Sequence, residues 1–266
     1  MCEMLGLSAK RRLPANGILR EFFSHAEQHP HGWGLATFPD GGAPAIDKEP
    51  VCAVGSAHLK GRLDAPIEER TLIAHIRFAT VGHLEYANCH PFSAADNRGR
   101  IWTLAHNGTI FNGSELNDYV GIQYGETDSE RILLHLINRI DREQIRLGRS
   151  LDEEERFGTL AAVIAELSKG NKLNLLIYDG EVLYAHCNFR GTLHFRHEAD
   201  AVTFSTRPLS GEGWEEAPFT SLVAVKNGEI IHTSPPHGNE YIYNPNDYRM
   251  VYMDFARLER HKGEKQ

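Results

Sequence analysis

The chain has 266 residues, of which 24% are charged and 41% are hydrophobic, and its formal net charge is −8. This composition is typical of a globular protein that is large enough to bury its own core. The acidic balance is unlike the basic surface of nucleic-acid-binding proteins, and it disfavours adsorption to anionic membranes. We therefore expect neither nucleic acid nor membrane among its partners.

Export and membrane signals are not evident in the sequence. No apolar run approaches the ~20 residues that span a bilayer, and the segment Met1–Arg12 lacks the basic-then-apolar order of a signal peptide. The cysteines, Cys2, Cys52, Cys89 and Cys187, lie too far apart for a CxxC motif. We expect four thiols in a cytoplasmic protein.

The first half of the chain predicts strands interrupted by one amphipathic helix, as judged from the spacing of apolar residues. In chain order, these elements are a strand at Glu3–Ser8, a helix at Gly17–His29, and strands at Gly34–Phe38, Thr71–Phe78 and Ile101–His106.

The second half begins with two consecutive helices, at Asp128–Arg146 and Glu153–Ser168, and continues with strands. The expected strands are Leu173–Tyr178, Val182–His186, Ala201–Ser205, Ser221–Lys226 and Glu229–Thr233. Asp179-Gly180 and Asn227-Gly228 favour tight hairpin turns. Many strands with few helices predict an α+β fold. We expect one domain over residues 1–256 and a disordered tail over residues 257–266.

Cys2 is the first residue with chemical potential. Removal of Met1 would expose an α-amine with a reference pKa of ~7.7–8.0 beside the thiol, and such an amine can activate the thiol as a nucleophile. The alternative is that a cysteine stands at the start of a strand by chance.

Two further positions could bind a substrate. Arg77 follows apolar strand residues, where a guanidinium needs a partner and can grip a carboxylate through two hydrogen bonds. A structural ion pair is the alternative. Asp128 opens a helix within Glu126–Glu130, and its carboxylate could receive an ammonium group. Thr127 and Glu130 also fit a capping box there, and both roles can coexist.

Asn107-Gly108 follows a predicted strand. The Asn107 side-chain amide and the Gly108 backbone N–H could form an oxyanion hole, the pair of donors that stabilises a tetrahedral intermediate. The alternative is a simple turn, which this dipeptide favours.

In order and spacing, these motifs resemble the class II glutamine amidotransferases, the glutaminase domains of amidophosphoribosyltransferase, glucosamine-6-phosphate synthase and asparagine synthetase. The resemblance covers roughly the first half of the chain. The matching segments are Met1-Cys2, His75–Thr80 with Gly82, Asn88–Phe92, His106–Gly108 and Glu126–Glu130. The segments Met1–Gly6, His31–Gly34 and Ser205–Leu209 look closer to a stand-alone subgroup that carries no synthase domain.

The resemblance implies a four-layer αββα sandwich of two antiparallel sheets, which is the N-terminal nucleophile hydrolase fold. It also implies that Cys2 is the nucleophile and its own amine the general base. Asn107 and Gly108 would form the oxyanion hole, while Arg77 and Asp128 would hold the substrate α-carboxylate and α-ammonium. The remaining pocket-lining residues would be Phe78, Thr80 and His90.

The implied activity is hydrolysis of the glutamine side-chain amide through a Cys2 thioester, without a cofactor. A hydrolase of a larger γ-glutamyl compound, of the ergothioneine-pathway or glutathione-degradation type, stays open. So does a non-catalytic binding module of the same fold. Ammonia could pass to a partner protein or simply be released. We expect no metal site, because no histidine pair occurs in an HExxH context or shows a third ligand.

Overall fold

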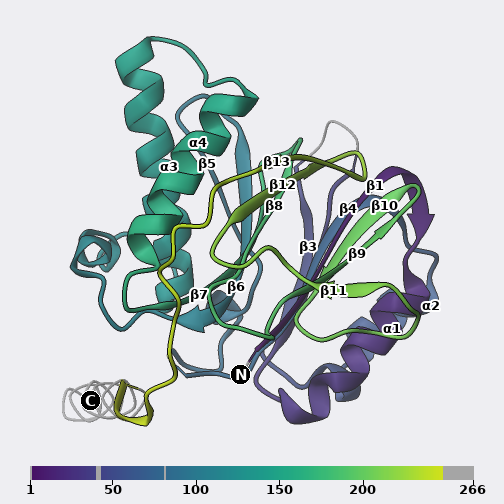
Figure 1. Cartoon of the computed structure of the whole chain (residues 1–266). Helices are drawn as coiled ribbons and strands as arrows, with labels where there is room; N and C mark the ends of the chain where they lie inside the picture. Colours follow the sequence, from purple (N-terminus) through teal and green to yellow (C-terminus); the bar gives the residue numbers. More distant parts are fainter. Residues whose placement is uncertain (1, 40–42, 81, 248–266) are drawn as a thin grey trace, which may run out of the picture.

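Two sheets with helices on their outer faces make up the fold (Figure 1). The computed structural model describes residues 2–39, 43–80 and 82–247, so the predicted disordered tail at residues 257–266 lies outside the described residues. Every strand pair that is described runs antiparallel. No helix in this part of the chain is both long and apolar enough to span a bilayer.

The first sheet contains the N-terminal strand at its centre, in the strand order β11-β9-β10-β1-β4-β2-β3. Its strands are β1 (Glu3–Pro14), β2 (Trp33–Thr37), β3 (Ala45–Glu49), β4 (Glu68–Ile76), β9 (His194–Glu198), β10 (Ala201–Ser205) and β11 (Trp214–Glu216). Two helices, α1 (Asn16–Ser24) and α2 (Ala57–Asp64), pack apolar side chains such as Leu19, Phe22 and Leu59 against its outer face.

The second sheet has the order β13-β12-β8-β7-β6-β5. Its strands are β5 (Phe92–Ala95), β6 (Ile101–Thr109), β7 (Lys172–Tyr178), β8 (Leu183–His186), β12 (Leu222–Lys226) and β13 (Glu229–Thr233). Helices α3 (Asp128–Leu147) and α4 (Glu153–Leu167) cover its outer face (Figure 1). Short 3₁₀ helices occur at His25–Gln28, Ala53–Gly55, Tyr86–Asn88 and Ser114–Tyr119.

A third apolar layer lies between the two sheets. It contains Met4 from β1, Ile73 from β4, Ala105 from β6 and Leu176 from β7, all fully buried. Because side chains alternate along a strand, the residues between them face the helices instead, as Leu104 and Leu175 do. The predicted αββα sandwich of two antiparallel sheets is confirmed.

Both predicted hairpins are present. Strand β7 pairs with β8 across Asp179-Gly180, and β12 pairs with β13 across Asn227-Gly228. Gly180 has a φ of 92°, and Asn227 and Gly228 have φ values of 51° and 75°. These positive φ angles are what tight hairpin turns require and what Asn and Gly tolerate.

Several predicted boundaries were wrong, and some elements were not predicted. The helix predicted at Gly17–His29 ends at Ser24 and continues only as a 3₁₀ turn. The strand predicted to end at Phe78 ends at Ile76, so Arg77 opens a loop. The elements without a prediction, α2, β3, β5, β9 and β11, are short, and most are partly exposed and polar. They therefore lack a clear hydrophobic period.

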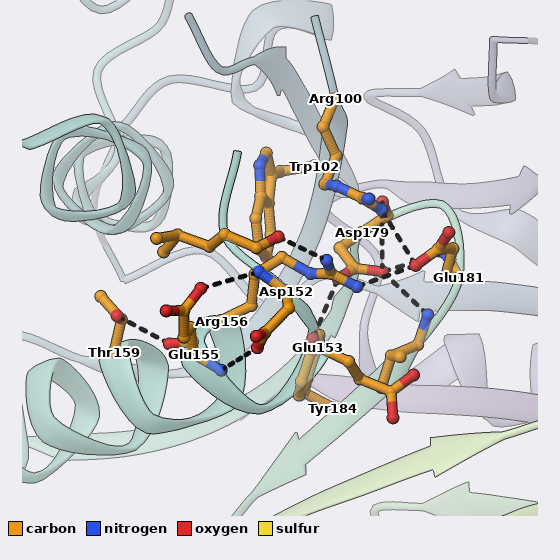
Figure 2. Close-up of polar contacts among 12 residues, drawn as sticks. Arg100, Trp102, Asp152, Glu153, Glu155, Arg156, Thr159, Asp179, Glu181 and Tyr184 are labelled. Carbon is orange, nitrogen blue, oxygen red and sulfur yellow. Dashed lines mark hydrogen bonds and ion pairs between the residues drawn. The ribbon is translucent and has the colours of Figure 1, made fainter. Parts of the chain in front are cut away.

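A buried ion pair joins α4 to the β7–β8 hairpin (Figure 2). The Arg156 Nε donates to the Asp179 carboxylate at 2.8 Å, and the two side chains are 5% and 0% exposed. Tyr184 Oη donates to the same carboxylate at 2.9 Å, and Glu181 accepts from the other side of the Arg156 guanidinium. Asp179 therefore both shapes the turn and fixes the helix to the sheet.

Candidate active site

Cys2 lies immediately before β1, at the end of the layer between the sheets. Its sulfur accepts a hydrogen bond from the Phe78 backbone N–H at 3.3 Å and lies 3.5 Å from the Phe78 carbonyl oxygen. Burial raises the pKa of the Cys2 thiol, while the Phe78 hydrogen bond and the charges of Arg77 and Lys172 act in the opposite direction. The Phe78 backbone thus fixes the thiol, and the charges of Arg77 and Lys172 favour its thiolate form.

The strand that follows Cys2 is anchored by the residue next to it. The buried Glu3 carboxylate accepts from His25 Nδ1 at 2.9 Å and from His29 Nε2 at 3.0 Å, and it also pairs with Arg207. Burial raises the pKa of Glu3, but the hydrogen bonds from His29, His25 and Arg207 outweigh it and bring this pKa down to about 2. Thr206 Oγ1 accepts from the Met4 N–H. These contacts give the Ser205–Leu209 segment a structural role beside Cys2.

Arg77 opens the loop after β4 and is only 2% exposed. Its guanidinium donates to the backbone carbonyls of His83 at 3.0 Å and Gly82 at 3.2 Å. Burial lowers the pKa of Arg77, and the charges of Cys2 and Asp128 are among those that oppose this effect. Arg77, Cys2 and Asp128 therefore belong to one electrostatic neighbourhood, although they come from three separate segments.

His31 supports this loop, a role that the sequence did not suggest. Its Nδ1 accepts from the Ala79 N–H at 2.9 Å, and its ring lies 5.0 Å from the Phe78 ring. Burial, followed by the Arg77 charge, lowers the pKa of His31. Phe78 is consequently fixed through both its backbone and its ring, while Thr80 lies half-buried further along the same loop.

Asn107 and Gly108 lie within β6 and do not form a turn. Strand β6 continues to Thr109, and the two residues pair with Asn174 and Leu173 of β7. The turn interpretation is therefore wrong. A Cβ on Gly108 would lie 2.0 Å from the Lys172 carbonyl oxygen, so only glycine allows this close approach of the strands.

The Asn107 side chain is 1% exposed, and its two ends have different surroundings. Its Oδ1 accepts from Lys172 Nζ at 3.3 Å. Its Nδ2 is buried and has no hydrogen-bond partner within the described residues. Because buried amide donors are nearly always paired, this N–H group is suited to bind a ligand atom.

Asp128 begins α3 and is 7% exposed. Its Oδ2 accepts from the Ile110 N–H at 2.9 Å, which ties the helix to the segment just after Gly108. The Thr127 hydroxyl accepts from the Glu130 N–H, as an N-cap does. The Glu130 carboxylate instead accepts from the backbone N–H groups of Tyr124 and Gly125. The predicted capping box is thus only half present.

His90 is packed inside the protein. Its ring stacks on that of His75 at a centroid distance of 4.0 Å and contacts Phe92 at 4.7 Å. Burial, with the charges of neighbouring groups, lowers the pKa of His90 well below its ordinary value. The described contacts thus bury His90 against His75 and Phe92, and none of them joins it to Cys2.

Elsewhere in the molecule, the features to consider are possible metal-ligand clusters and cavities. Over residues 2–39, 43–80 and 82–247, no three His, Cys, Asp or Glu side chains gather as metal ligands. A cavity of about 610 Å³ opens near the far ends of β6 and β7, where Thr103 and Tyr178 lie in its wall. None of the catalytic or substrate-binding residues predicted from the sequence lines it.

Comparisons with known proteins identify the family of the chain. A sequence model of the class II glutamine amidotransferases matches residues 1–199. The chain is 30% identical to an uncharacterized protein of Methanocaldococcus jannaschii over 263 residues, which is 88% of this chain and 72% of that protein. It is 31% identical over 194 residues to YafJ of Escherichia coli K12, whose name places it provisionally among the glutamine amidotransferases; the match covers 71% of this chain and 73% of YafJ.

A solved structure shares the fold. The crystal structure of a predicted glutamine amidotransferase from Pseudomonas aeruginosa superposes with a TM-score of 0.61 at 23% identity. The superposition covers 87% of this chain and all of that one.

Proposed function

Because the chain belongs to the class II glutamine amidotransferases, we propose that it hydrolyses the side-chain amide of glutamine to glutamate and ammonia. The observation that carries this proposal is the buried Asn107 Nδ2, a donor without a partner among the described residues, in the same site as the Cys2 thiol. A cation at Arg77 and an anion at Asp128 complete the set that a zwitterionic amide needs.

The amino-acid head of the substrate would bind between these charges. Arg77 would receive the α-carboxylate through parallel N–H···O bonds, and Asp128 would receive the α-ammonium. Phe78 and Thr80 would line the pocket from the same loop. His90, whose ring stacks on that of His75, would line the pocket as well.

The reaction would begin with transfer of the thiol proton to the α-amine of Cys2, which is free only after Met1 has been removed. The thiolate attacks the amide carbon, and Asn107 Nδ2 with the Gly108 N–H stabilises the oxyanion that forms. The ammonium of Cys2 then returns the proton to the leaving nitrogen, so that ammonia departs and a γ-glutamyl thioester remains. Water attacks the thioester, which yields glutamate and the free thiol.

The same proposal extends to the whole chain. Residues 1–256 would form a single catalytic domain in a cytoplasmic protein, and the ammonia would be released or passed to a partner protein. A larger γ-glutamyl compound would make the same head-group contacts as glutamine and is the alternative substrate.

A substrate panel tests the proposal. After intact mass has established that Met1 is absent, glutamate release is measured from glutamine and from γ-glutamyl amides and peptides. We expect turnover of glutamine by the wild-type chain and none by Cys2→Ala. Faster turnover of a larger γ-glutamyl compound would assign the alternative substrate. No release from any member of the panel would reject the hydrolase and favour a binding module.

A further inference from the structure

Lys172 is a buried lysine in the candidate site that the sequence did not single out. It is the first residue of β7 and is 1% exposed. Its Nζ lies 3.3 Å from Asn107 Oδ1 and 5.2 Å from the centroid of the Phe189 ring. Burial of an ammonium group is unfavourable unless polar or π partners compensate for it, so a lysine at this position calls for an explanation.

The contact with Asn107 determines which end of that amide is presented to the site. An ammonium group has three donors and no acceptor, so the amide atom facing Lys172 has to be the oxygen. The Asn107 NH₂ group must then point the other way, where it has no partner within the described residues. A positive charge on Oδ1 also polarises the amide and strengthens its N–H groups as donors.

The charge of Lys172 also reaches the nucleophile. Burial lowers the pKa of Lys172 to about 8, and the charges of Cys2 and Cys187 oppose this effect. In turn, the charge of Lys172, like that of Arg77, lowers the pKa of the Cys2 thiol. The charge of Lys172 also lowers the pKa values of His106 and Cys187, although burial is the largest influence on both groups. Near neutral pH the ammonium form of Lys172 predominates, so one positive charge acts on both the Asn107 amide and the Cys2 thiol.

We propose that Lys172 is a positioning residue for the oxyanion hole, which holds the Asn107 amide with its NH₂ group toward the reacting carbonyl and stabilises the Cys2 thiolate through its charge. This inference rests on the proposed function, because it assigns a role within the same site. Lys172 acts through Asn107 and Cys2 and does not itself bond to the substrate.

The first test is a double-mutant cycle. Lys172→Met keeps an unbranched side chain that is one atom shorter and removes the charge. It should lower kcat by about 10- to 100-fold with little change in KM, since the oxyanion forms only in the transition state. Lys172→Met combined with Asn107→Ala should lose less activity than the product of the two single losses, because part of the effect of Lys172 passes through Asn107. Fully additive losses would overturn the role of Lys172 through Asn107.

Two measurements serve as controls for an effect of Lys172→Met on folding. Because Lys172 has a lowered pKa, its buried charge disfavours the folded state below about pH 8, and this cost disappears as pH rises from 8 toward the ordinary lysine value of ~10.4. Lys172→Met should therefore unfold at the same or a higher temperature at pH 7. The control variant Lys226→Met removes a lysine of β12 that pairs with Glu153 of α4, and it should leave kcat unchanged. Lys172 would have a structural role only if Lys172→Met lost both stability and activity and if the losses of kcat in the double-mutant cycle were additive.

A readout without substrate separates this inference from the proposed function. The alkylation rate of Cys2 by iodoacetamide is followed against pH by peptide mass spectrometry, in wild type and Lys172→Met with Met1 removed from both. We expect the Lys172→Met profile to shift to higher pH. An unchanged profile would overturn the role of Lys172 at Cys2. If the Lys172→Met profile is shifted as expected but the wild type turns over no substrate, only the proposed function is rejected.

Discussion

Hydrogen bonds from neighbouring residues fix the orientation of the polar groups in the candidate site. Asn107 is held at Oδ1 by Lys172, and its Nδ2 has no hydrogen-bond partner in the described part of the chain. Cys2 is fixed by the Phe78 backbone, and Arg77 by the carbonyls of Gly82 and His83. A site whose polar groups are oriented before substrate arrives loses little free energy to reorganisation during the reaction.

Arg77→Lys tests the proposed carboxylate contact. A lysine keeps the charge but loses the planar fork, so one charge-assisted hydrogen bond, worth about 1.5–3 kcal/mol, should be lost. We expect KM for glutamine to rise by roughly 10- to 100-fold, with a smaller change in kcat, in steady-state kinetics. Arg149→Lys, at an exposed pair with Glu155, is the matched control. Wild-type KM in Arg77→Lys would refute the carboxylate role.

At the scale of elements, the position of Cys2 depends on how β1 is fixed at its N-terminal end. Strand β1 pairs with β4 and β10, and the Glu3 carboxylate joins it to the His25–Gln28 turn and to Arg207. These contacts come from segments far apart in the sequence. The nucleophile is therefore positioned by the assembled sheet.

Glu3→Gln should destabilise the protein in a pH-dependent way. The pKa of Glu3 is lowered from 4.5 to about 2, so its contribution to stability is present above pH 4.5 and is lost as pH falls through 2. At about 1.4 kcal/mol per pKa unit, the upper value of this contribution is about 3 kcal/mol. Urea unfolding at pH 7 and at pH 3 should show a smaller difference between variant and wild type at pH 3. A difference independent of pH would contradict this account.

The Arg156–Asp179 pair makes a contrasting element-scale prediction. Removing one partner of a buried ion pair leaves the other charge uncompensated, so Asp179→Ala should cost about 3–5 kcal/mol of unfolding free energy. Glu181→Ala, at a side chain that is 47% exposed, should cost about 1 kcal/mol or less. Thermal or urea unfolding measures both.

Activity provides the second readout for this pair. Asp179 follows the end of β7 opposite to Lys172, about 20 Å away along the strand. Asp179→Ala should therefore keep wild-type kcat at temperatures where it remains folded. Equal destabilisation by the two variants, or a loss of kcat in folded Asp179→Ala, would contradict a purely structural role.

At the scale of the whole molecule, the four layers bring the site together. Met4, Ala105 and Leu176 fill the space between the sheets, and the same alternation directs Asn107 and Lys172 toward it at one end. Helix α3 contributes Asp128 at its first turn. With Cys2 and Arg77, one end of the sandwich thus collects groups from five separate segments.

The sequence predicted most of the long elements and both Asp-Gly and Asn-Gly hairpins, because these signals are local. It left Asn107-Gly108 open between a turn and a functional site, since the requirement for glycine comes from the Lys172 carbonyl on the neighbouring strand. Lys172 itself lies just before the apolar run at Leu173, where a lysine normally marks a solvated strand end. Cross-strand contacts of this kind are fixed only when the sheet forms.

The proposed dependence of catalysis on the free α-amine of Cys2 is the central claim, and it can be measured directly. The chain is prepared with a cleavable peptide before Cys2, and glutamate release from glutamine is followed while a specific protease exposes Cys2. Intact mass gives the cleaved fraction at each time. We predict that activity is absent before cleavage and rises in proportion to that fraction. Equal activity before and after cleavage would contradict the account.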